Sequence, residues 1–187
     1  MPLSHPVHRR EIHNRVIDMK MYAREDGLYD VEARLIDRKP FAFKRAINPI
    51  PIPAGQSLHD LWIRLTLDGD RFIRYVEASS DVTPYTICKG AEPTLNVLVG
   101  LRIGSGWSRR IKELLRGTAS CTHLMEMLLP MATTTLQGMQ GLNFNRHKLL
   151  DPMSAPLQLD SCYAYSSERE VVKVLWPEHY TITKSSI

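Results

Sequence analysis

The chain has 187 residues, 43% hydrophobic and 24% charged, which indicates one globular domain of ordinary composition over residues 1–187. Its net charge of +4 allows an acidic partner or a small anionic ligand, but the basic clusters lack interleaved aromatic residues, which argues against nucleic-acid binding. The three cysteines form no CxxC pair, so no metal site is predicted, and no apolar run approaches the length that spans a bilayer. We therefore expect a soluble, cytoplasmic protein.

Two half-buried strands are predicted after a polar N-terminal tail over residues 1–14. Apolar residues alternate with polar ones over residues 15–24 and again over 29–35. A three-residue loop at 25–27, with Gly27 in the left-handed conformation, keeps the apolar faces of both strands together, whereas a two-residue turn would separate them. The predicted pairs are Ala23 with Tyr29, Met21 with Val31 and Ile17 with Leu35.

A second hairpin is predicted further along the chain. The alternating runs 61–67 and 72–78 flank Asp68-Gly69, which is a strong turn signal. The register of this hairpin stays open, because two pairs of residues compete for its inner face. These pairs are Ile73 with Tyr75 and Phe72 with Val76. Between the two hairpins, alternating prolines over residues 48–55 predict an extended connection on the surface.

The second half of the chain is expected to be helical. The apolar stretch 94–103 predicts a buried helix, with a break at residues 104–106. The next helix would be capped by Ser105 or Ser108 and would end at Gly117. Its predicted inner stripe is Trp107, Ile111, Leu114 and Leu115.

A further helix is predicted to begin near residues 118–120. Pro130 should kink or split this helix, and Gly138 and Gly141 should end it. Its predicted apolar face is Leu124, Met127, Leu128 and Met131.

The C-terminal part of the sequence is less regular. Residues 151–156 are predicted as loop, 161–175 as one strand or a short helix with a strand, and 177–187 as a polar tail. The structure of residues 142–176 therefore stays open. Together with the two hairpins, the predicted helices indicate an α+β fold, in which helices cover one face of an antiparallel sheet of about four strands.

Cys121 is the strongest candidate for reactive chemistry. If Ser120 or Thr118 caps the helix, Cys121 falls in its first turn, where unpaired backbone N–H groups and the helix dipole stabilise a thiolate. His123 is the candidate base, although two residues along a helix place the side chains about 200° apart, unless the cysteine precedes the helix proper. The structural alternative is a small buried cysteine beside a capping or surface histidine.

His59 is the second candidate base. It precedes the strand at 61–67 and could face the helix that carries Cys121; the alternative is a solvated histidine at the end of a strand. Arg64 on the same strand is a candidate holder of an anionic group. Trp107 and Arg116 precede the cysteine in sequence and are further candidates for substrate binding. The sequence leaves the identity of any cofactor unknown.

Three segments carry a resemblance to known proteins: the hairpin loop 25–27, the hairpin LWIRLTLDGDRFI, and the block from Trp107 to Leu124 with Cys121-Thr-His-Leu124 as its most specific part. On these segments the chain resembles, over residues 9–140, a family of uncharacterised bacterial proteins, a domain of unknown function, whose members tend to have Gly in place of Ser120. The resemblance implies no assigned activity. The order of elements is also distantly similar to U-type iron–sulfur scaffolds and sulfur-acceptor proteins, in which Cys121 would match the last cluster cysteine, whereas Cys88 matches no earlier one.

Three functional hypotheses follow from these features. The first is a small-molecule or sulfur-handling protein that uses Cys121, with His123 or His59 as base and Arg64 as anion holder. The second is a non-catalytic accessory subunit whose basic helix and proline segment bind a partner protein or a second copy of the chain. The third is an enzyme that binds an apolar acid or thioester between sheet and helices, with Cys121 only structural.

Overall fold

The structure is a computed structural model that describes residues 3–47, 50–150 and 158–182, and the side chains of all of these except 141 and 143–150. The chain divides into two compact units, residues 1–141 and 142–187, which are described separately. One helix, α2, runs across the division. A single domain over 1–187 stays an expectation.

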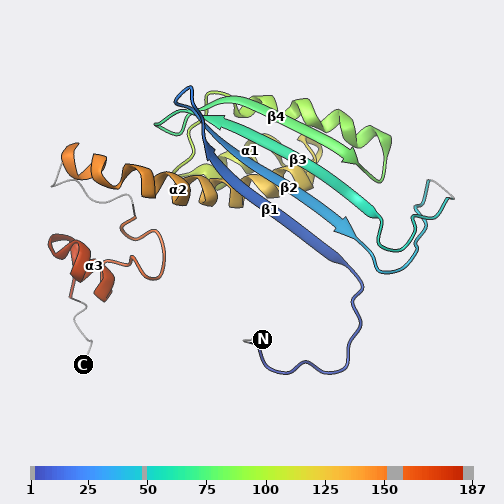
Figure 1. Ribbon diagram of the computed structural model, residues 1–187, viewed down its shortest axis with the longest axis horizontal. Coiled ribbons are helices and arrows are strands. Elements are labelled where there is room, and N and C mark those ends of the chain that lie inside the picture. The colour runs from blue at the N-terminus through green and yellow to red at the C-terminus, as the bar shows by residue number, and fades with distance from the viewer. Residues whose placement is uncertain (1–2, 48–49, 151–157, 183–187) are drawn as a thin grey trace. The chain divides into compact units, whose positions relative to one another are not determined.

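A four-stranded antiparallel sheet forms one layer of the first unit (Figure 1). Its strands follow one another in space as they do in sequence, so each neighbouring pair is a hairpin or a longer antiparallel connection. The strands are β1 (Asn14–Ala23), β2 (Tyr29–Arg38), β3 (Ser57–Leu67) and β4 (Ile73–Val82). With the helices on its inner face, the sheet confirms the predicted α+β fold.

The first hairpin has the predicted register. Gly27 has φ of +82°, which favours glycine, and Ala23 pairs with Tyr29 directly after the loop. The pairs Met21 with Val31 and Ile17 with Leu35 are also present. The rule that the apolar residues of β1 and β2 share one face therefore predicted the register of this hairpin correctly.

The second hairpin resolves its open register by a β-bulge. The pairing shifts between Thr66 and Leu67, so that Leu67 pairs with Ile73 while Thr66 pairs with Tyr75. Arg74 is the extra residue, and the alternation of side chains is reset there. Ile73 is fully buried, whereas Tyr75 is exposed. The inner face thus takes one residue from each predicted alternative, Ile73 and Val76.

The hydrophobic core lies between the inner face of the sheet and the helices (Figure 1). Because side chains alternate along a strand, Val31, Ala33 and Leu35 of β2 all point to this face. Helices η1 (Thr86–Leu98), α1 (Trp107–Leu115), η2 (Gly117–Ala119) and α2 (Thr122–Leu150) follow the sheet in the chain. The predicted inner residues of α1 and α2 are buried or half-buried, as expected: Trp107, Ile111, Leu114, Leu115, Leu124, Met127, Leu128 and Met131.

The predicted helix over residues 94–103 is misplaced. The helix begins earlier, at Thr86, has 3₁₀ geometry and ends at Leu98. Gly100 then adopts φ of +83°, which breaks the helix. The chain beyond it pairs with the start of β4, where the N–H of Ile73 donates to the carbonyl of Leu101 at 2.9 Å. Residues in the range 99–103 thus form backbone hydrogen bonds at the start of β4 instead of extending the helix.

The ends of α1 and α2 also differ from expectation. Gly106, with φ of +81°, occupies the N-cap of α1, so neither predicted serine caps it. Pro130 does not split α2, and the helix continues past Gly138 to Leu150. A methyl group on Gly138 would meet the thioether sulfur of Met21. The glycine thus leaves room for the Met21 side chain between β1 and α2.

The connection at residues 39–56 is extended in part. Phe43 and Ile52 exchange two backbone hydrogen bonds, and residues 48–49 of the predicted proline segment lie outside the described residues. The predicted tail at residues 3–13 has no regular structure and exposed side chains.

The second unit contains helix α3 (Glu170–Leu175) and a 3₁₀ turn, η3 (Pro177–His179). Val172 of α3 is buried, and the rings of Tyr165 and Trp176 lie 5.5 Å apart. The helical alternative for residues 161–175 is present, but no strand occurs within the described range 158–182. The predicted loop at 151–156 lies outside the described residues. No helix in the described ranges has the length and hydropathy needed to cross a bilayer.

Candidate functional site

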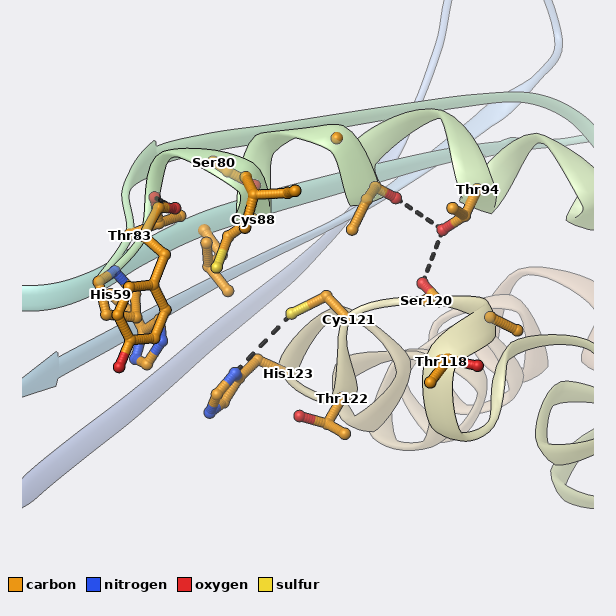
Figure 2. A pocket seen from close by; sticks show the side chains of 17 residues that line it. His59, Ser80, Thr83, Cys88, Thr94, Thr118, Ser120, Cys121, Thr122 and His123 are labelled. Atoms are coloured by element: carbon orange, nitrogen blue, oxygen red, sulfur yellow. Dashed lines mark hydrogen bonds between the residues drawn. The ribbon is translucent and has the colours of Figure 1, made fainter. Parts of the chain in front are cut away.

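A cavity of about 570 Å³ lies between the start of η1, the inner face of β3 and the start of α2 (Figure 2). Its walls include two imidazoles, two thiols and several hydroxyl groups. Thr94 on η1 and Ser120 before α2 are joined by a hydrogen bond of 2.7 Å between their hydroxyl oxygens, which links the two helical walls. The cavity therefore collects reactive side chains from segments that are far apart in the sequence.

Cys121 is half-buried in this cavity, immediately before the first residue of α2. The N-cap position directs its thiol toward the unpaired backbone N–H groups of the first helical turn. Burial alone would raise the pKa of the thiol, but hydrogen bonds from His123 and from the backbone N–H groups of Leu124 and His123 outweigh it and lower that pKa. The predicted reactive cysteine thus has the electrostatic environment that a thiolate needs.

His123 lies beside Cys121 despite the two-residue spacing. Its Nδ1 atom is 3.8 Å from Sγ of Cys121, and Figure 2 shows the two side chains directed toward each other. This contact is possible because Cys121 has a cap conformation, so the helical divergence of about 200° does not apply. The hydrogen bond with Cys121 raises the pKa of His123, against the opposing effect of burial. The pair can therefore exchange a proton.

His59, the third residue of β3, reaches the same cavity from the sheet. It pairs with Asp37 on β2 in the sheet, and its Nδ1 atom lies 2.9 Å from Oδ2 of Asp37. Arg15 pairs with Asp37 from the other side, on β1, and contacts both carboxylate oxygens at 2.7 and 2.8 Å. Arg15, Asp37 and His59 thus lie side by side in one row across three strands. Nε2 of His13 adds a fourth contact, 3.2 Å from Oδ1 of Asp37.

The contacts along this row shift the pKa values of Asp37 and of the imidazole of His59. Asp37 is 1% exposed, and although burial by itself would raise its pKa, hydrogen bonds from Arg15 and His59 hold the pKa at about 2. The ring of His59 lies against that of His123, with centroids 4.1 Å apart and planes at 39°. Burial and the neighbouring His123 lower the pKa of His59, although Asp37 acts in the opposite sense. The two imidazoles therefore differ in basicity, His123 being the stronger base.

Asp37, His59 and His123 also offer the closest arrangement to a metal site in the part of the chain that the structure describes. One ligand atom of each lies within 4.8 Å of the others. However, Arg15 occupies both oxygens of Asp37 and adds a positive charge next to any bound cation. A metal would have to displace this guanidinium, so the arrangement fits a hydrogen-bonded network better than a metal centre.

The three residues predicted for substrate binding are not brought to this cavity. Arg64 points from the opposite face of β3, where it pairs with Glu32 and Glu77 at 2.7 and 2.9 Å. Trp107 is buried, and its indole N–H donates to the carbonyl of Leu128 at 2.9 Å, so it has a packing role. Arg116 is exposed near the end of α1. The alternation along β3 explains the direction of Arg64, and the apolar face of α1 explains the burial of Trp107.

Sequence reasoning missed three residues of the site, Arg15, Asp37 and Cys88. Asp37 carried a usable signal, because it is in phase with Val31, Ala33 and Leu35 on the inner face of β2. A carboxylate in an apolar row must find a partner. The positions of Arg15 and Cys88 depend on strand register and on the path of η1, for which the sequence has no local marker.

Comparison with known proteins identifies the family of the chain. The model of the family described as Protein of unknown function (DUF2889) matches residues 13–137, which is more than half of the chain. The chain therefore belongs to this family. The matched range includes the whole sheet, both imidazoles and Cys121. No curated protein and no solved structure matches the chain, so the similarity to U-type iron–sulfur scaffolds stays a prediction.

Proposed function

We propose that this member of the DUF2889 family is a thiol-dependent enzyme that acts on a small acyl thioester or ester, with Cys121 as nucleophile. The observation that carries the proposal is the contact of 3.8 Å between Sγ of Cys121 and Nδ1 of His123, at a helix N-terminus that opens into a cavity. A thiol beside an imidazole is the usual arrangement of a cysteine nucleophile and its base.

In the proposed reaction, His123 takes the proton of Cys121, and the thiolate attacks the carbonyl carbon of the substrate. The oxyanion that forms needs hydrogen-bond donors, and we assign this role to backbone N–H groups in the first turn of α2, which follow Cys121 directly. His123 then returns the proton to the leaving group, which leaves an acyl group on Sγ. Transfer of that acyl group to water or to another acceptor completes the cycle.

Asp37 on β2 and His59 on β3 support the same chemistry from the sheet. Asp37 holds Nδ1 of His59 at 2.9 Å and thereby sets the orientation of the ring that lies against His123. Because the pKa of His59 is lowered and that of His123 is raised, His59 loses its proton at a lower pH than His123 does. We assign to His59 the positioning of His123 and the activation of the acyl acceptor.

The walls of the cavity favour an uncharged acyl group. The described lining combines apolar side chains, such as Leu61 and Ile87, with hydroxyl groups, such as Ser80 and Thr83. Apart from the two imidazoles, none of the described lining residues carries an ionisable nitrogen or a carboxylate. Such a surface binds a short apolar acyl chain and offers hydrogen bonds to its carbonyl group.

The test is thiol-specific alkylation of the wild-type protein with iodoacetamide at pH 6.5. Cys162, which is exposed in the second unit, is an internal control with no imidazole contact among the described residues. Cys121 should be alkylated roughly tenfold faster than Cys162 because more of it is thiolate. Equal rates would remove the basis of the proposal. A burst of product from an activated thioester, absent in Cys121→Ser, would then establish the acyl-enzyme.

The exposed face of α1 supports the accessory-subunit hypothesis as a second candidate. Arg109, Lys112 and Arg116 line a shallow hollow together with Glu113, and Arg109 is 85% exposed. A stoichiometric acidic partner that co-purifies with the wild type but not with a charge-reversed α1 would favour this candidate.

A further inference from the structure

The cavity that contains Cys121 also contains a second thiol. Cys88 lies near the start of η1, is half-buried and lines the same cavity. Figure 2 shows the thiols of Cys88 and Cys121 entering the space between η1 and the start of α2 from opposite sides. The function proposed above uses only one of them, so the presence of the second thiol needs an explanation.

The structure keeps the two segments that carry these thiols close to each other. The hydrogen bond between Thr94 and Ser120 joins η1 to the residue just before Cys121. Cys121 precedes α2, and Cys88 is the third residue of η1, so neither lies in the middle of a long regular element. A disulfide requires the two Cβ atoms to approach to about 4 Å. A disulfide between these thiols therefore needs the start of η1 and the residue before α2 to approach each other across the cavity.

We propose that Cys88 is a resolving thiol, which forms a disulfide with Cys121 when a hydroperoxide oxidises the site. The disulfide removes the nucleophile and so switches the proposed activity off reversibly. The inference rests on the proposed function in one respect, namely that Cys121 is the reactive thiol.

The chemistry needs only the oxidant in addition to the residues of the site. The thiolate of Cys121 attacks an oxygen of the hydroperoxide, the O–O bond breaks, and Cys121 becomes a sulfenic acid. His123, which shares its proton with Cys121, protonates the oxygen that leaves. Cys88 then attacks Sγ of Cys121 and the S–O bond breaks, with release of water. In total, two thiols and one peroxide give one disulfide, one water and one alcohol, or two waters from hydrogen peroxide.

The selectivity of this reaction follows from the surroundings of the thiols. The pKa of Cys121 is lowered, so Cys121 reacts with peroxide first. The Cys88 thiol in the same cavity then intercepts the sulfenic acid before a second oxidation makes it irreversible. Cys162 is exposed in the other unit and serves as the thiol that should take no part.

The experiment treats the full-length Cys162→Ser variant with one equivalent of hydrogen peroxide, blocks the remaining thiols with iodoacetamide and maps the peptides without reduction. The expected result is loss of both thiols, a peptide pair linked through Cys88 and Cys121, and full recovery of the thiols with dithiothreitol. In Cys88→Ser, Cys121 should instead be trapped as a sulfenic acid by dimedone. Oxidation of Cys121 to the sulfinic acid while Cys88 stays free, or disulfide-linked dimers, would overturn the inference.

The outcome separates this inference from the function on which it rests. Fast alkylation of Cys121 in the untreated wild type without a disulfide on oxidation refutes the role of Cys88 alone. Alkylation of Cys121 no faster than that of Cys162 refutes the proposed function, whatever the oxidant does. Cysteine-to-serine changes replace one small side chain with another, so loss of folding is not expected; circular dichroism of both variants checks this.

Discussion

The imidazole of His59 on β3 lies against that of His123 on α2, with ring centroids 4.1 Å apart. The first ring is oriented by the hydrogen bond that its Nδ1–H donates to Asp37, and the thiol of Cys121 contacts the second ring. The ring contact is therefore the link between a buried carboxylate in the sheet and a thiol at a helix N-terminus. Four predictions test this arrangement and the fold around it.

Replacing His123 should slow the chemistry of Cys121. In His123→Asn the hydrogen bond that lowers the pKa of Cys121 is lost, while burial, which raises that pKa, remains. Alkylation by iodoacetamide at pH 6.5 should fall roughly tenfold, and the midpoint of its pH profile should move to higher pH. Cys162 in the same molecule gives the reference rate. An unchanged pH profile for Cys121 would show that His123 does not act on the thiol.

Asp37 should make stability depend on pH. Its folded-state pKa of about 2 is below the ordinary value of 3.8, so its contribution is fully present above pH 3.8 and is lost as the pH falls toward 2. The shift corresponds to about 2 kcal/mol. Urea unfolding of wild type and Asp37→Asn should therefore show a difference at pH 7 that narrows steadily below pH 4. A difference that is constant from pH 7 to pH 3 would contradict the low pKa.

Arg64 should have no influence on the cavity. It lies on the outer face of the sheet and pairs with Glu32 and Glu77. The variant Arg64→Ala should keep the alkylation rate of Cys121 within about twofold of the wild type and lose less than about 1 kcal/mol of stability, as exposed ion pairs contribute little. Arg15→Ala, which removes the contacts to Asp37, is the matched comparison and should alter both quantities. A large loss of Cys121 reactivity in Arg64→Ala would place that arginine back at the site.

Gly138 on α2 leaves room for the side chain of Met21 on β1. In Gly138→Ala the added methyl group would meet the sulfur of Met21, which must move aside, so the variant should gain less than the helix-propensity benefit of about 0.5–1 kcal/mol. In a Met21→Ala background the same change should stabilise the protein by about 0.5–1 kcal/mol, because alanine favours a helix more than glycine does. Thermal unfolding of the four proteins gives the coupling. Equal effects in both backgrounds would mean that Met21 is not the obstacle.

The sequence by itself determined the sheet and the buried sides of the helices. Alternating residues with Gly27 and Asp68-Gly69 predict the two hairpins, because a one-residue slip in a strand exchanges its buried and exposed faces. The periodic apolar residues of α1 and α2 predict their buried sides, because residues three and four apart lie on the same face of a helix. Cys121, His123 and His59 were also identifiable as candidates, since a thiol at a helix start has a local electrostatic cause.

Only the tertiary structure decided which of these residues meet. Arg15, Asp37 and His59 form a row because three strands share one register, and His123 joins them because α2 packs over that row. Cys121 contacts His123 because α2 begins at Thr122, so that Cys121 precedes the helix instead of lying in its first turn. Arg64 has as much charge as Arg15 but lies on the other face of the sheet. Periodicity reports which side of one element is buried, whereas contacts between elements depend on register and packing, which are properties of the whole chain.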